Sequence, residues 1–387
     1  MCDGFGRANL PYGVDDAGRV VVAYQDSVID LASLDLDVGP DVWMSGSLME
    51  FFSLGPQAWA LTRGQIQGHL DDLPATAIRP RSGVRLVLPW EVADYTDFYA
   101  CEEHATAMGR LLRPGAEPLP AAWRHLPMGY HGRSSTVLAS GEEIPRPSGL
   151  RRVGEDEPQF GPTARLDVEV EVGFVIGAGS GRGRSVPPER AGEHVFGVVL
   201  VNDWSARDIQ AFEYQPLGPF LGKSFATSVS PWVVPLVALD PWRVVGPAQH
   251  PPPAPYLRAD EPRGLDIRLE LELNGTVVST TTAAGLYWSM SQQLAHLTAN
   301  GACLRAGELF ASGTISGSTP HSEGSLMELT GAGANPVELA DGSRRDWLAD
   351  GDTATVRGWC GERGRPGWLS LGEVAGTVAG VGKEDGR

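Results

Sequence analysis

The chain has 387 residues, of which 42% are hydrophobic and 20% are charged, a balance typical of a globular protein with a large core. This length predicts two domains, or one large domain with an appendage. The formal net charge of −17 argues against nucleic acids and anionic membrane surfaces as partners, because the field of the protein repels both.

Four cysteines are scattered along the chain without a CxxC pair: Cys2, Cys101, Cys303 and Cys360. In a chain of this size we expect reduced thiols and a cytoplasmic protein. The first residues contain no basic stretch followed by an apolar run, so no signal peptide is predicted. No apolar run reaches the length that spans a membrane.

The first part of the chain, residues 1–88, is predicted to be a small β-rich domain. Three elements are predicted in it: strands at 19–24 and 27–33, and a helix at 47–70 with a Gly-Pro break. The Pro, Gly and Arg residues of 78–85 are typical of a connection to the next domain.

The second part, residues 89–387, is predicted to be a larger β-rich domain. Its predicted strands are 166–176, 195–202, 265–273, 276–282 and 353–359. Asn274-Gly275 is a strong hairpin signal between two of them. One clear helix is predicted at 286–301, where an apolar stripe ends at Asn300-Gly301.

Two predicted strands carry pairs of glutamates at the same spacing. Glu169 and Glu171 alternate with valines in "RLDVEVEVGF", and Glu270 and Glu272 alternate with leucines in "LELELNG". Side chains two apart in a strand share one face, so each pair is either a solvated face or half of a metal site. The spacing alone does not decide, and base rates favour the solvated face.

Two other patterns are weak. "GPFLGKS", residues 218–224, is one residue short of a phosphate-binding loop, and Pro219 and Phe220 stand where backbone amides are required. Cys101 and His104 are spaced for a thiolate–imidazole pair, but the neighbouring Glu102 and Glu103 disfavour a thiolate.

Three segments concentrate acids, bases and hydroxyl groups: residues 94–113, 201–232 and 311–330. The second begins with Asp203 at a predicted strand end and continues as a helix that places Arg207, Gln210 and Tyr214 on one face. It also contains Lys223. Lys223 and Lys383 are the only lysines among 31 basic residues, and Lys383 lies in the polar tail. Lys223 is therefore a candidate for a chemical role.

Together these segments resemble the fumarylacetoacetase (fumarylacetoacetate hydrolase) family. The resemblance rests on "DYTDFYACEEHATAMG", "LPMGYHGRSSTV", "DVEVEVGF", "VNDWSARDIQAFEYQPLGPFLGKSF", "SPWVVP" and "ASGTISG". It runs from "NLPYGV" near residue 9 almost to the C-terminus. The long block from Asp203 to Lys223 is its most specific part.

The resemblance implies a fold that is mainly β with some α. A small SH3-like N-terminal domain, residues 1–88, would be followed by a mixed β-sandwich roll, residues 89–387, in a homodimer with its sites near the interface. The implied activity is metal-dependent hydrolysis of the carbon–carbon bond of 4-fumarylacetoacetate to fumarate and acetoacetate. This is the last step of tyrosine and phenylalanine breakdown through homogentisate.

The resemblance also implies a set of site residues. The carboxylates that would hold Ca²⁺ or Mg²⁺ are Asp97, Glu169, Glu171 and Asp203, with Lys223 and Thr227 as further cation-associated positions. The implied general base is His104, oriented by Glu328. The groups that would stabilise developing negative charge are Arg207, Gln210 and Lys223. The implied substrate contacts are Tyr99, Arg113, Tyr130, Gln210, Tyr214 and Thr314.

The chemistry explains why such groups are needed. Water must attack a carbonyl and the leaving group is a carbanion, so a base and preorganised positive charge both lower the barrier. A local cluster of a divalent ion, Arg113, Arg207 and Lys223 would bind a dianionic diketo acid despite the acidic chain. Cys101 and Glu102 depart from the Ser and Arg that relatives often carry, which leaves fine specificity open.

Two alternatives remain at this stage. One is a related activity on an acylpyruvate or other oxo-acid, as hydrolase, decarboxylase or isomerase. The other is a non-catalytic, metal-stabilised binding protein, which would not need a general base.

Overall fold

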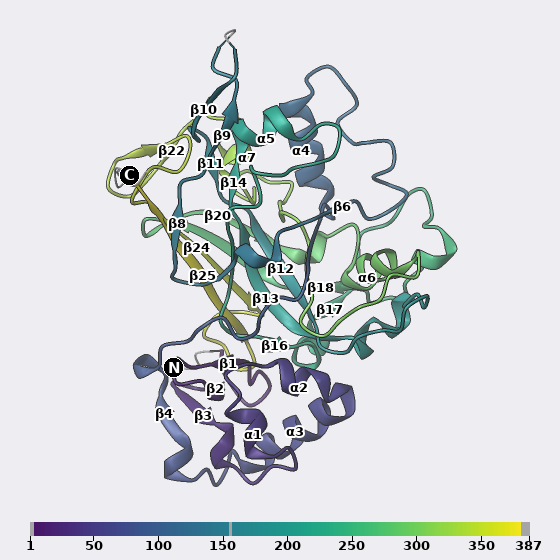
Figure 1. Cartoon of the computed structure of the whole chain (residues 1–387), viewed down its shortest axis with the longest axis vertical. Helices are drawn as coiled ribbons and strands as arrows, with labels where there is room; N and C mark the ends of the chain where they lie inside the picture. Colours follow the sequence, from purple (N-terminus) through teal and green to yellow (C-terminus); the bar gives the residue numbers. More distant parts are fainter. Residues whose placement is uncertain (1–3, 155–156, 381–387) are drawn as a thin grey trace.

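The computed structural model describes residues 4–154 and 157–380. Figure 1 shows a smaller N-terminal body below a larger β-rich body. Within the described residues, no helix combines the length and apolar character needed to cross a membrane.

The N-terminal body is a four-stranded antiparallel sheet flanked by helices (Figure 1). Its strands are β1 (Tyr12–Val14), β2 (Val20–Tyr24), β3 (Ser27–Asp30) and β4 (Ile78–Pro80). Its helices are α1 (Pro40–Trp43), α2 (Met49–Ser53) and α3 (Gly55–His69). The predicted break falls between α2 and α3, where Gly55 has a φ of +80° and Pro56 lacks a backbone donor.

An eight-stranded mixed sheet forms the centre of the larger body. Its order is β6-β5-β21-β12-β13-β15-β7, with β16 also pairing with β13. The strands are β5 (Tyr95–Phe98), β6 (Gly129–His131), β7 (Val137–Ala139), β12 (Val170–Ile176), β13 (Val195–Asp203), β15 (Thr227–Val229), β16 (Val234–Pro235) and β21 (Leu309–Ala311).

A five-stranded sheet packs against one face of the central sheet, in the order β20-β19-β24-β25-β8. Its strands are β8 (Glu143–Pro145), β19 (Arg268–Leu273), β20 (Thr276–Thr282), β24 (Thr353–Cys360) and β25 (Leu369–Ala379). The N-terminal body covers much of the other face, so β12 is buried at every position. The expected fold class, mainly β with some α in a sandwich-like arrangement, is confirmed.

Several predicted elements differ in their bounds. The strand predicted at 27–33 ends as β3 at Asp30, and a 3-10 helix follows at Leu31–Ser33. The strand predicted at 166–176 is divided into β11 (Leu166–Asp167) and β12, because the amide of Glu169 donates to the side chain of Asn202 (3.1 Å) instead of a backbone carbonyl. The helix predicted at 286–301 is the shorter α6 (Met290–Thr298), because Ser289 and Gln292 form a capping box that starts it later.

Candidate active site

Four carboxylates, carried by three strands of the central sheet and the residues next to them, lie close together in the interior of the protein. They belong to Asp97 on β5, Glu169 just before β12, Glu171 on β12, and Asp203 at the end of β13. One oxygen from each lies within 4.8 Å of the others, and all four side chains are buried. The same four positions were predicted as ligands from the resemblance.

Glu171 is the least satisfied member of this cluster. Neither of its carboxylate oxygens has a hydrogen-bond partner among the described residues, and the residue is 0% exposed. Burial and the neighbouring carboxylates, Asp97 foremost, raise the pKa of Glu171 well above its usual range. Burial and Asp203 do the same to the pKa of Asp97. A buried charge without a partner is costly, and an all-oxygen donor set suits a hard divalent cation, so these residues fit one.

Lys223 closes one side of the cluster. Its Nζ donates to Asp203 Oδ2 at 2.8 Å and also to Glu169. Asp203 accepts two more hydrogen bonds, from Tyr130 Oη at 2.6 Å and from Thr227 Oγ1 at 2.7 Å. Burial opposes ionisation of Glu169, yet Lys223 and Arg207 hold its pKa well below the usual range. The only lysine outside the tail therefore binds two of the four carboxylates, and its single positive charge offsets one of them.

A second group pairs an imidazole with a carboxylate. His104 on α4 (Glu102–Leu112) lies with Nδ1 2.7 Å from Oε2 of Glu328 on α7 (Leu326–Leu329). Burial raises the pKa of Glu328, but His104 and the hydroxyls of two serines together lower it by more, so the net shift is downward. An ionised carboxylate only accepts hydrogen bonds, so Nδ1 carries a proton, and Nε2 is the ring nitrogen that the pairing with Glu328 leaves available.

Arg207 connects the acidic cluster to its surroundings. It begins α5 (Arg207–Glu213), and its Nη2 donates to Glu169 Oε1 at 2.6 Å while Nη1 donates to Gln210 Oε1 at 3.1 Å. Burial lowers the pKa of Arg207, but the carboxylates of Glu169 and Asp167 raise it more. The guanidinium is therefore a fixed positive charge at the edge of the cluster.

The remaining predicted positions are less connected. The ring of Tyr99 meets that of His104 edge to face, with centroids 5.4 Å apart. Thr314 is buried and its hydroxyl has no partner among the described residues. Arg113 donates to the carbonyl of Pro118 at 2.7 Å, and the hydroxyl of Tyr214 accepts from Gln215 at 2.9 Å. The structure gives Arg113 and Tyr214 no hydrogen bond to the other site residues.

The two weak sequence patterns are not sites of the kind they suggest. Burial raises the pKa of the Cys101 thiol to about 12, and its Sγ donates to the carbonyl of Ser316 at 3.2 Å, so it is no thiolate. In the segment 218–224 the amides of Phe220 and Gly222 donate to Glu213 at 3.2 and 2.7 Å, and are therefore not directed at a phosphate.

Three polar residues of the site were missed by sequence reasoning: Asp167, Ser316 and Ser325. Asp167 stands two residues before Glu169, at the spacing that already linked Glu169 to Glu171. Ser325 stands three residues before Glu328, a capping-box spacing. Ser316 has no comparable signal in the sequence, because its hydroxyl reaches Glu328 (2.9 Å) only through the tertiary fold.

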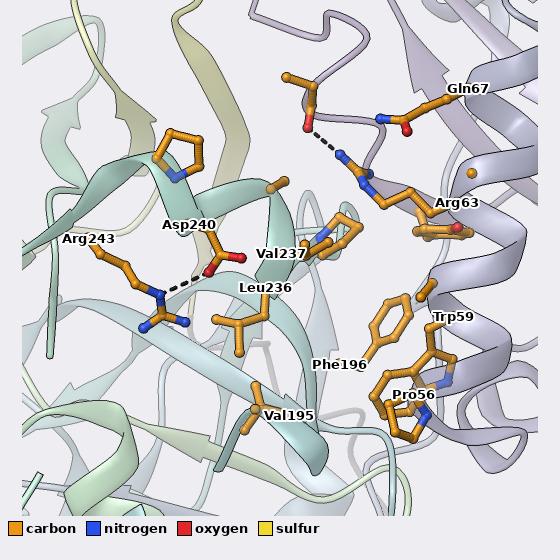
Figure 2. A pocket seen from close by; sticks show the side chains of 18 residues that line it. Pro56, Trp59, Arg63, Gln67, Val195, Phe196, Leu236, Val237, Asp240 and Arg243 are labelled. Atoms are coloured by element: carbon orange, nitrogen blue, oxygen red, sulfur yellow. Dashed lines mark hydrogen bonds and ion pairs between the residues drawn. The ribbon is translucent and has the colours of Figure 1, made fainter. Parts of the chain in front are cut away.

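Two cavities clarify where a ligand can enter. A cavity of about 660 Å³ lies between α3 and the segment 235–243, lined by Trp59, Phe196 and Leu236, but by none of the predicted site residues (Figure 2). A smaller cavity of about 140 Å³ is lined by Tyr130 and Lys223, which both donate to Asp203 of the acidic cluster, and by the exposed Phe220. The smaller one leads to the candidate site.

Comparison with known proteins places this fold and site in a class. The sequence profile described as "Fumarylacetoacetase N-terminal" matches residues 8–89, and that described as "Fumarylacetoacetate (FAA) hydrolase C-terminal" matches residues 94–379. The chain belongs to the fumarylacetoacetate hydrolase family.

Within this family the chain is similar to fumarylacetoacetases. It is 42% identical to the Homo sapiens fumarylacetoacetase, with 96% of this chain and 95% of the human protein aligned. It is 40% identical to that of Arabidopsis thaliana, over 91% of this chain and 90% of the plant protein.

The fold is also shared with more distant solved structures. Fumarylacetoacetate hydrolase from Exiguobacterium antarcticum gives a TM-score of 0.58 at 19% identity, covering 96% of this chain and 99% of that one. Maleylpyruvate hydrolase from Sphingobium, in complex with manganese and pyruvate, gives 0.54 at 17% identity, covering 95% and 98%. At these identities the likeness concerns the fold alone.

Proposed function

We propose that this chain is a hydrolase that cleaves the carbon–carbon bond of 4-fumarylacetoacetate, giving fumarate and acetoacetate. The observation that carries the proposal is the meeting of two groups in one buried place. The four-carboxylate cluster, in which Glu171 has no hydrogen-bond partner among residues 4–154 and 157–380, lies near enough to the His104–Glu328 pair for His104 to act on the charge of Glu169, and it is linked to Arg207 and Lys223. Family membership and about 40% identity to fumarylacetoacetases support the same reaction.

The cofactor is a divalent cation, Ca²⁺ or Mg²⁺. Asp97, Glu169, Glu171 and Asp203 would hold it, with Lys223 and Thr227 fixing the orientation of Asp203. When bound, it supplies Lewis-acid chemistry, withdrawing charge from the carbonyl oxygens of the substrate. Carboxylates alone do not discriminate between the two ions.

His104 acts as the general base. Its Nε2 takes a proton from water, whose oxygen bonds to the substrate carbonyl carbon. The Glu328 carboxylate stabilises the resulting imidazolium through Nδ1–H. When the carbon–carbon bond breaks, the electron pair stays on the leaving carbon, which takes a proton from the imidazolium. One water is thus consumed, and His104 returns to its starting state.

The substrate is held by groups that surround this pair. Arg207, Gln210 and Lys223 stabilise the negative charge that develops as the bond breaks. The substrate contacts are Tyr99, Arg113, Tyr130, Gln210, Tyr214 and Thr314. Closure of the site on the substrate would bring in Arg113 and Tyr214, whose polar groups bond elsewhere in the free protein.

The chain acts as a homodimer in the cytoplasm. Leu217, Phe220 and Phe160 are 97%, 65% and 73% exposed, near α5 and the neighbouring β-hairpin of β9 (Ser148–Arg151) and β10 (Gln159–Pro162). The segment 214–222 carries no charged residue, so a second copy meets little repulsion there. A Leu217→Glu, Phe220→Glu variant should be monomeric by light scattering, and one that stays dimeric would contradict this interface. We place the domain boundary at residues 88/89, close to the end of the first matched profile at residue 89 and before the second begins at residue 94.

An assay with purified protein tests the reaction. Loss of the diketone absorbance of fumarylacetoacetate should be rapid with a divalent ion and stop when a chelator removes it, then recover when Ca²⁺ or Mg²⁺ is added back. Acylpyruvates serve as the comparison substrates. Turnover of acylpyruvates but not of fumarylacetoacetate would replace this proposal with a related oxo-acid activity.

A further inference from the structure

Asp167 is a buried carboxylate at the centre of the site that the proposed chemistry leaves without a role. It ends β11, where it pairs with Ser205 of β14 (Ser205–Ala206), and it is 0% exposed. Besides the amide of the next residue, Val168 (2.8 Å), its two oxygens accept from two other parts of the chain, and both of these carry residues of the proposed mechanism. Burying a carboxylate costs free energy unless it is paired, so its partners indicate what this residue does.

The first partner is the guanidinium of Arg207. Arg207 Nε donates to Asp167 Oδ2 at 2.7 Å, while Nη1 and Nη2 donate to Gln210 and Glu169. The guanidinium is a planar fork, so acceptors on three of its nitrogens fix both its position and its rotation. Without Asp167, Arg207 would be held only by Gln210 and Glu169, both at the opposite end of the fork.

The second partner is the start of α7. Asp167 Oδ1 accepts from the amide of Leu326 at 2.8 Å, and the amide of Met327 lies 3.3 Å from both oxygens. Glu328 is the next residue, and its carboxylate is fixed by Ser325 (2.7 Å) and Ser316 (2.9 Å). The position of the residue that orients His104 therefore depends on the same carboxylate that orients Arg207.

We infer that Asp167 is a positioning residue that couples the charge-stabilising side of the site, through Arg207, to the His104–Glu328 pair, through α7. It touches neither substrate nor reacting atoms. Its loss should reduce the rate of the chemical step more than substrate binding, because both partners act on charge that develops in the transition state. The kinetic test rests on the proposed function, whereas the structural test below does not.

Asp352 provides a matched control. It is 3% exposed and accepts from Arg345 (2.7 and 2.9 Å), from Asn274 (2.7 Å) and from the amide of Ala349 (2.7 Å). Like Asp167 it is a buried carboxylate that joins an arginine to a backbone amide, but it contacts none of the proposed site residues. Variants at the two positions separate a loss of stability from a loss of positioning.

The kinetic test compares Asp167→Asn with Asp352→Asn. Asparagine keeps an acceptor for the α7 amides and turns an N–H₂ group toward Arg207. We expect kcat to fall by at least about tenfold with KM changed by less than about threefold, and Asp352→Asn to leave both near wild type. In the Arg207→Gln background, Asp167→Asn should cost less than about twofold more, because the arginine it positions is gone. An unchanged kcat, or losses that simply multiply, would overturn the inference.

The structural test uses amide deuterium exchange and needs no substrate. In Asp167→Ala, peptides covering 324–330 and 207–213 should exchange at least about tenfold faster, while β19 stays protected. In Asp352→Ala, β19 should exchange faster, while the peptides covering 324–330 and 207–213 should stay protected. Wild-type protection of 324–330 in Asp167→Ala would overturn the inference. If that variant does not fold, Asp167→Asn is measured instead. Because asparagine keeps an acceptor for the α7 amides, the deciding peptide is then 207–213, and wild-type protection there would overturn the inference. A wild-type protein inactive on fumarylacetoacetate would contradict the proposed function, but exchange would still decide the role of Asp167.

Discussion

Glu171 and Glu272 occupy equivalent places in two similar sequence patterns but have different partners. Glu272 accepts from Arg357 Nη1 at 2.6 Å on a half-buried face of β19. Glu171 is fully buried, has no hydrogen-bond partner in the part of the chain that the structure describes, and has three other carboxylates close by. At the scale of single residues, Glu272 is bound to a basic side chain and forms an ordinary ion pair. Glu171 has no such hydrogen-bonded partner among the described residues and is therefore a candidate metal ligand.

Glu171→Gln should weaken divalent cation binding by at least about tenfold, or about 1.4 kcal/mol, because one charged ligand is lost. The metal-free variant should melt a few degrees above metal-free wild type, since a buried repulsive charge is removed. Calorimetric titration with Ca²⁺ and Mg²⁺, and melting curves with and without ions, measure both effects. Glu272→Gln is the control and should bind like wild type; equal affinity in Glu171→Gln would contradict the ligand assignment.

His104→Ala should lower kcat by about 10²–10⁴-fold, the range for loss of a general base. Glu328→Gln should also lower kcat, because the imidazole loses the carboxylate that stabilises its charged form. The double variant should be little worse than His104→Ala, since the two residues act as a unit. Steady-state rates on fumarylacetoacetate measure this, and full activity in His104→Ala would refute the base assignment.

At the scale of elements, buried carboxylates connect segments whose backbones do not pair. Asp352 joins the β19–β20 hairpin, through Asn274, to Arg345 on β23 (Arg344–Arg345). Burial raises the pKa of Asp352, but Arg345 and the amide of Ala349 lower it more, so the net shift is downward. A carboxyl whose native pKa is depressed stabilises the fold above its unfolded pKa, and that contribution is lost as the pH falls through the native pKa.

Asp352→Asn should therefore lower the free energy of unfolding by about 2 kcal/mol at pH 7, because hydrogen bonds to a buried charge are lost. The difference in free energy of unfolding between this variant and wild type should become smaller below about pH 4, where an Asp in the unfolded chain is ordinarily protonated. It should vanish once the pH is below the native pKa of Asp352. Denaturant unfolding at a series of pH values measures the gap. A gap independent of pH would show that the charge of Asp352 is not its source.

At the scale of the whole molecule, an aromatic cluster joins the N-terminal body to the central sheet. Phe196 on β13 packs against Tyr12, Phe52 and Trp59, with ring centroids 5.5, 4.8 and 5.3 Å apart. The indole of Trp59 also donates to the carbonyl of Phe51 at 3.1 Å. This packing covers one face of β12 and β13, the strands that carry Glu171 and Asp203, and so keeps that face away from water.

Phe196→Ala should cost about 3–5 kcal/mol and divide thermal unfolding into two transitions, because the joint between the two bodies is weakened. Scanning calorimetry measures this. Phe310→Ala, in the core between the two sheets, should lower the melting temperature without dividing the transition. A single transition in Phe196→Ala would mean that other contacts keep the two bodies cooperative.

Much of the fold was predictable because local rules decide it. Asn274 and Gly275 adopt φ values of +47° and +81°, as their hairpin requires, and each predicted strand overlaps at least one strand of the structure. The bounds of α6 were wrong at its start because the Ser289 cap overrides the apolar stripe. The site residues came from family resemblance; their roles remain proposals, while their proximity is a property of the tertiary structure.

The sequence by itself determined the strand spacing that puts Glu169 and Glu171 together, the isolation of Lys223, and the family. Only the tertiary structure decided which glutamate pair is buried among other carboxylates. Strand periodicity fixes which side chains share a face, but whether that face meets water, arginine or other carboxylates depends on other strands that are distant in the sequence. Asp97 and Asp203 supply that neighbourhood for Glu171, and Arg357 supplies the opposite one for Glu272.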